Sequence, residues 1–165
     1  SSAASDVYKR QLIKLFTSKK FIPKYVQNNF KTIKVHPTGN VHIAILKTLQ
    51  EIDSLKPKIN NNVDPKIFSK ISKPEIINEY SDFVITFNGK KEADKSFILF
   101  KSGVIEGYGY FELFNNINSE KKINSRLVKL KESKRVKNYV YRLISEKRYK
   151  KLVNLKEIYK FSNIE

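Results

Sequence analysis

Apolar side chains recur along this chain with two periods, one typical of helices and one typical of strands. Over residues 41–55 they fall every three or four positions, which predicts a helix with one buried face. Thr38 or Asn40 suits the N-cap of that helix, and Pro57 ends it. A second stripe of this kind covers residues 136–144, so we expect another core-facing helix there.

Three stretches in the middle of the chain are typical of β-strands. They cover residues 83–87, 96–100 and 104–113 and are rich in aromatic and branched side chains. Ser102 and Gly103 lie between the last two stretches and suit a hairpin turn. The remainder of the chain is predicted to be helical. The expected fold class is therefore α+β, with a small antiparallel sheet of about three strands packed against C-terminal basic helices.

The part of the chain before residue 41 predicts a helix over residues 12–30 and a short strand over 32–35. The segment DVYKRQ within residues 1–11 resembles the translated end-sequence of a transposon used to prepare sequencing libraries. We interpret residues 1–11 as non-native and exclude them from the fold. On that interpretation the natural protein is cut at its front.

Composition divides the rest of the chain into four parts. Asparagine and proline are frequent over residues 61–80, which predicts a linker. Residues 12–60 precede the linker and form one part. Residues 81–155 follow it as a β-hairpin with basic helices, and residues 156–165 are a tail.

Positive charge is the strongest feature of the composition. The net charge is +17, from 33 Lys and Arg against 16 Asp and Glu. Residues 121–165 alone carry fifteen basic and four acidic residues. A field of this sign attracts polyanions, so we expect a nucleic-acid partner. The alternative is a solvated basic face whose lysines reflect A/T-rich codons.

Several classes of protein are disfavoured by what the sequence lacks. Cysteine is absent, which removes disulfides, thiolate zinc sites and cysteine nucleophiles and fits a cytoplasmic location. No apolar run reaches the length of a membrane span, so we expect no membrane partner. No secretory signal is visible.

Two aromatic–glycine pairs and two histidines are weaker candidates for chemistry. Gly107 and Gly109 alternate with Tyr108 and Tyr110 inside a strand, which is the wrong context for a phosphate loop. We expect the tyrosines to be core and the glycines to admit a helix close to the sheet, although tyrosines can also stack on unpaired bases. His36 and His42 lack the spacing of a metal pair and are interpreted as solvated surface residues.

Two segments resemble one type of nuclease. The stretch TGNVHIAILKTLQEIDSLKPKIN, from Thr38 to Asn60, is similar to the end of a GIY-YIG domain. The stretch FVITFNGKKEADKSFILFKSGVIEGYGYFEL and the helices after it resemble the C-terminal region of bacterial proteins that join a DnaQ-like proofreading exonuclease to a UvrC-like GIY-YIG module. The matching positions of the first segment are Thr38, Gly39, Ala44, Leu46, Ile52, Lys56, Pro57 and Asn60.

The resemblance implies phosphodiester hydrolysis with one divalent metal, Mg²⁺ or Mn²⁺, in the parent family. Carried over by position, the family's metal-binding glutamate falls at Thr48, whose hydroxyl is a poor substitute for a carboxylate. Glu51 is one turn away but points about 60° aside by the helical period. The family's arginine falls at about Gln11 and its tyrosine motif before residue 1, so Asn60 is the only catalytic-site remnant and no cofactor is expected on this chain.

We therefore expect a truncated, catalytically incomplete fragment of a DNA repair or DNA-processing nuclease that binds nucleic acid, DNA in the first instance. Two alternatives remain: the tail of an active exonuclease or endonuclease whose catalytic half is missing, and a basic protein-interaction domain. The side chains expected to contact nucleic acid are Lys56, Lys58, Lys134, Arg135, Lys137, Arg142, Lys147 and Arg148.

Overall fold

A computed structural model describes residues 32, 34, 36–57, 69–89, 94–112 and 120–156 of the 165-residue chain. The chain divides into two compact units between His36 and Pro37, and the elements below belong to the second unit. The predicted helix over residues 12–30 lies outside the described residues. Of the predicted strand over 32–35 only Thr32 and Lys34 are described, and neither is in a strand.

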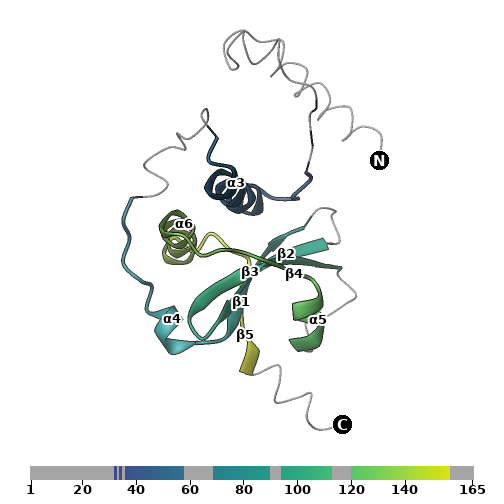
Figure 1. Ribbon diagram of the computed structural model, residues 1–165. Coiled ribbons are helices and arrows are strands. Elements are labelled where there is room, and N and C mark those ends of the chain that lie inside the picture. The colour runs from purple at the N-terminus through teal and green to yellow at the C-terminus, as the bar shows by residue number, and fades with distance from the viewer. Residues whose placement is uncertain are drawn as a thin grey trace. The chain divides into compact units, whose positions relative to one another are not determined.

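Five antiparallel strands form a single sheet in the order β4-β3-β2-β1-β5 (Figure 1). The three central strands are those that the sequence predicts. Their bounds are Phe83–Asn88 for β1, Asp94–Lys101 for β2 and Val104–Glu112 for β3. Ser102 and Gly103 join β2 to β3 with positive φ angles of 51° and 74°, as expected for a tight hairpin turn.

The sheet also has two edge strands in the region that we predicted to be wholly helical, and that prediction is wrong. Strand β4 covers Leu127–Lys129 and β5 covers Lys151–Asn154, three and four residues long. Strands this short hold too few positions to show a period of two. Their pairing comes from the neighbouring strands β3 and β1, a tertiary effect that no local pattern reports.

Helices α3 and α6 cover one face of the sheet, and the short helix α5 lies on the other (Figure 1). Helix α3 spans Val41–Leu55 and α6 spans Lys134–Ser145, close to the predicted bounds. Two shorter helices are α4, Ile76–Glu79, and α5, Glu120–Ser125. The α+β class is therefore confirmed.

Both faces of the central strands are buried, which explains their nearly continuous apolar sequences. On the α3–α6 face the core includes Phe83, Ile85, Ile98 and Phe100, together with the inward side chains of the two helices. The opposite face packs Val84, Phe97 and Leu99 with residues of α5 and the end of β5. Alternate residues of each strand therefore enter different cores, the pattern expected for a sheet covered on both sides.

Helices α3 and α6 run antiparallel. Near the start of α3, His42 contacts Tyr139 of α6 and the ring of Phe87. Near the end of α3, Asp53 and its neighbours line a groove with the first residues of α6. Asn40 caps α3 as predicted, because its Oδ1 accepts a hydrogen bond from the Ile43 N–H at 2.9 Å.

Gly107 admits a strand and Gly109 an aromatic ring, rather than the helix that we predicted. A Cβ at Gly107 would overlap the carbonyl oxygen of Val128 in β4. One at Gly109 would overlap the ring of Phe97 in β2 and would meet the Arg126 carbonyl oxygen at 2.6 Å. The alternating tyrosines face the other way. Tyr108 is buried in the core as predicted, and Tyr110 is partly buried, with its hydroxyl donating to the Thr38 carbonyl oxygen at 3.1 Å.

The compact units differ from the predicted domain parts. We expected residues 12–60 to form one part and residues 81–155 another. The division falls instead at residues 36 and 37, and the apolar side chains of α3 enter the same core as the sheet. A boundary between domains would leave that apolar face unburied, since α3 alone cannot cover it.

Candidate nucleic-acid interface

A shallow groove of ≈ 540 Å³ lies between the end of α3 and the start of α6. Three of the eight predicted nucleic-acid-binding residues line it, namely Lys56, Lys134 and Arg135, which we call the groove cations. Ile52, Asp53 and Ser133 complete the lining. Residues about 80 positions apart in the sequence therefore come together because the two helices are antiparallel.

The groove cations are exposed, and none takes part in the four ion pairs between described side chains. Asp53 is the one acid that lines the groove. The first turn of α6 contains no acid. Its N-cap residue, Ser133, accepts a hydrogen bond from the Val136 N–H at 3.3 Å. The start of a helix carries a partial positive charge that adds to the field of the cations. An anion therefore meets several positive charges in the groove.

Lys56 adopts a left-handed backbone conformation, with φ 44° and ψ 54°, and its N–H donates to the Ile52 carbonyl oxygen at the end of α3. Glycine is the usual residue there, since a side chain costs roughly 1–2 kcal/mol in this conformation. The backbone conformation therefore disfavours lysine at position 56, where its side chain adds a positive charge to the groove.

Three of the other predicted cations are held by acids. Lys137 pairs with Glu132 at 2.6 Å, and the hydrogen bond and charge of Glu132 raise the pKa of Lys137. Arg142 and Arg148 both pair with Glu146, at 3.3 and 2.7 Å. Three of the predicted nucleic-acid-binding residues therefore have an acid as their partner in this structure.

Lys147 is exposed just after α6, in the turn that follows the helix. Lys58, and Asn60, the predicted remnant of a catalytic site, lie outside the described residues.

Thr48, which the motif resemblance aligns with a metal-binding glutamate, is exposed on α3 and donates its hydroxyl to the Ala44 carbonyl oxygen at 2.9 Å. Glu51 is also exposed, on the same helix. Among the described residues there is no group of three or more His, Asp and Glu side chains placed to hold a metal ion. The Thr48 hydroxyl is therefore hydrogen-bonded to the backbone of its own helix, as threonine hydroxyls often are within helices.

His42 differs from the prediction that it is solvated. Its Nδ1 lies 2.8 Å from the Tyr139 hydroxyl, and its ring is 5.3 Å from that of Phe87. Burial, together with the charge of Arg148, lowers the pKa of His42, and burial raises the pKa of Tyr139 to about 12. His36 is exposed in a loop, as expected.

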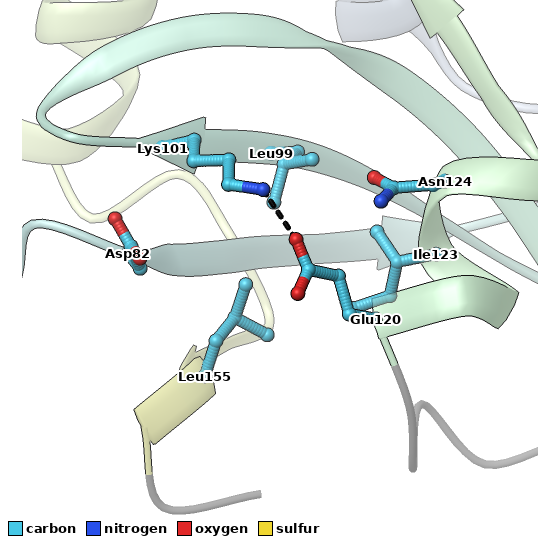
Figure 2. A pocket seen from close by; sticks show the side chains of 7 residues that line it. All are labelled: Asp82, Leu99, Lys101, Glu120, Ile123, Asn124 and Leu155. Carbon is cyan, nitrogen blue, oxygen red and sulfur yellow. Dashed lines mark hydrogen bonds and ion pairs between the residues drawn. The ribbon is translucent and has the colours of Figure 1, made fainter. Parts of the chain in front are cut away.

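A second hollow of ≈ 230 Å³ lies on the opposite face of the sheet (Figure 2). Leu99, Ile123 and Leu155 form its apolar part, and an ion pair joins Lys101 to Glu120 at its edge. Asp82 also lines it and accepts a hydrogen bond from the Ser102 N–H at 2.7 Å. Its charged groups are thus engaged with one another or with the backbone, unlike the groove cations.

Comparisons of the chain with models of known protein families, with curated proteins and with solved structures gave no match. The resemblance to GIY-YIG proteins therefore rests on the sequence motifs alone. No helix in the described part of the chain is both long and apolar enough to cross a bilayer.

Asp53 and Ser133 are the groove residues that sequence reasoning missed. Asp53 lies three residues before Lys56, so the helical period could have placed the two on neighbouring turns. Ser133 is a recognisable N-cap before an apolar stripe. Nothing in the local sequence shows that these two helix ends meet.

Proposed function

We propose that this protein binds nucleic acid, DNA in the first instance, through the groove between α3 and α6. The observation that carries the proposal is the meeting of Lys56, Lys134 and Arg135 in one groove, with no ion-pair partner among the described side chains. Phosphate groups are the ligands that such a site attracts, because lysine and arginine supply most protein contacts to nucleic-acid backbones.

We further propose that the chain is part of a GIY-YIG/UvrC-like nuclease and does not cleave by itself. The motif similarity over residues 38–60 supports the first part. The second part is supported by Thr48, which stands where a carboxylate would hold the metal. On this proposal the chain contributes affinity for the nucleic-acid substrate and not the catalytic carboxylate.

Fluorescence anisotropy with a labelled 20-base-pair DNA duplex tests the binding proposal. We expect the Lys134→Ala/Arg135→Ala variant to lower the affinity and to reduce the slope of log K against log salt by about 2, one for each lost phosphate contact. The matched control is Lys95→Ala/Lys121→Ala, which removes the same charge from exposed positions at β2 and α5. An equal loss of affinity in both variants would show that binding responds to net charge alone and would refute the proposal that the groove is the binding site.

A further inference from the structure

A second group of cations lies at the other end of the α3–α6 pair. Four exposed cations, which we call the loop cations, lie at the connection from α6 to β5: Lys147, Arg148, Lys150 and Lys151, the last being the first residue of β5. The acid beside them is Glu146, which pairs with Arg148 and Arg142. The start of α3 lies near this end, since His42 contacts Tyr139 and is influenced by the charge of Arg148.

The two groups share an unusual backbone feature. Lys147 has a φ of 52°, and Lys56 in the groove has a φ of 44°. At each helix end, a lysine thus occupies a left-handed position where glycine would avoid steric cost. Among the described non-glycine residues, only Ser102 in the hairpin turn shares a positive φ with them. The presence of lysine rather than glycine at both positions suggests that the positive charge contributes to binding at both ends of the helix pair.

The separation of the two groups is set by α6. Its 12 residues rise about 18 Å at 1.5 Å per residue. The major groove of a B-form duplex is about 12 Å wide, and the phosphates lie along both of its edges. Two cation groups about 18 Å apart can therefore reach the two backbones at once. Val41, Thr48, Glu51 and Leu55 of α3 are exposed, and Lys47 of the same helix is partly buried.

The described Phe and Tyr residues favour paired over unpaired strands as the partner. Proteins that grip single strands stack bases on exposed aromatic rings. Eleven of the 20 Phe and Tyr residues lie in the described part of the chain, and none of these eleven is exposed. Tyr108 is in the core, and Tyr110 is partly buried against it.

We propose that the loop cations form a second phosphate-binding surface and that the protein bridges the two backbones of a duplex, one at each end of the helix pair. This inference rests on the proposed function, because it needs the groove cations to contact phosphate. It assigns Lys150 and Lys151 as contact residues in addition to Lys147 and Arg148. It also names duplex rather than single-stranded nucleic acid as the partner.

The test compares the Lys150→Ala/Lys151→Ala variant with the wild-type protein. Both side chains are exposed. The backbone groups donate and accept hydrogen bonds that alanine keeps, from the Lys150 N–H to the Thr86 carbonyl oxygen and from the Thr86 hydroxyl to the Lys151 carbonyl oxygen. Thermal unfolding checks that the fold is kept. Anisotropy is measured from 50 to 200 mM salt with a 20-base-pair duplex and with a 20-nucleotide oligo(dT) strand.

We expect the variant to bind duplex about tenfold more weakly at 100 mM salt and to reduce the slope of log K against log salt by about 2. We expect the wild-type protein to bind oligo(dT) more weakly than duplex. A variant that matches wild type while Lys134→Ala/Arg135→Ala loses binding would overturn the second surface and leave the proposed function standing. Oligo(dT) binding as tight as duplex binding would overturn the choice of duplex. A wild-type protein that binds neither probe would instead overturn the proposed function itself.

Discussion

The Nδ1 of His42 and the hydroxyl of Tyr139 lie 2.8 Å apart and join the start of α3 to the middle of α6. Both rings are partly or fully buried, and Phe87 of β1 packs against the imidazole. The same two helices form the candidate interface, so this contact helps to fix the position of one groove wall against the other.

Burial of His42 near Arg148 makes stability depend on pH. Burial and Arg148 lower the pKa of His42 below its ordinary value of about 6.5. Between the folded and unfolded pKa values the unfolded chain binds more protons, so the free energy of unfolding falls as pH falls through 6.5. We expect denaturant unfolding to show this loss between pH 7.5 and 6, and His42→Gln to remove it. An unchanged pH dependence in His42→Gln would contradict the assignment.

Tyr139→Phe tests the contact from the other side. It removes the hydroxyl but keeps the ring in the core, so we expect a loss of about 0.5–1.5 kcal/mol in the free energy of unfolding. Combined with His42→Gln, the losses should be less than additive, because the two side chains interact. Strict additivity in the double-mutant cycle would indicate that the two groups do not interact.

Gly107 should not tolerate a side chain. A Cβ there would overlap the Val128 carbonyl oxygen of β4, so Gly107→Ala must displace the edge strand. We expect a loss of about 1–3 kcal/mol in the free energy of unfolding, the usual range for overpacking. Val104→Ala, at an exposed position of the same strand, should change it by less than about 0.5 kcal/mol. Similar effects of the two substitutions would show that β4 does not approach the glycine.

Asp53 should weaken nucleic-acid binding in the wild-type protein. It lines the groove with three cations and repels phosphate there. We expect Asp53→Asn to tighten duplex binding about threefold in anisotropy measurements at 100 mM salt, as removal of a like charge does. Glu79→Gln, an exposed acid on α4, makes the same change in net charge elsewhere. Equal tightening by both would point to net charge rather than to the groove.

Cleavage is not expected from this chain. With Mg²⁺ or Mn²⁺ and a supercoiled plasmid, we predict no strand scission, because Thr48 cannot supply the carboxylate of a metal site. Thr48→Glu should not create activity either, since a single added carboxylate does not assemble a metal site with the other described residues. Metal-dependent cleavage by the Thr48→Glu variant alone would contradict the mapping of that position.

Helices α3 and α6 and the central strands follow from local sequence, but the interface does not, and α4 lies within the predicted linker. Asn40 and the apolar stripe define α3 through short-range rules. The antiparallel contact of α3 with α6 depends on packing against the sheet, so the meeting of Lys56 with Lys134 has no local signal. Charge counting likewise identified Lys137, Arg142 and Arg148 as candidates, yet their pairing with Glu132 and Glu146 appears only once side chains are placed. The resemblance to a nuclease remains a prediction.

The salt dependence of duplex binding by the wild-type protein tests the central claim most directly. If the groove and loop cations together make about six phosphate contacts, log K should fall with log salt at a slope of about −5. An affinity that does not change between 50 and 200 mM salt, or no measurable binding at 50 mM, would contradict the claim that this protein binds a nucleic-acid backbone.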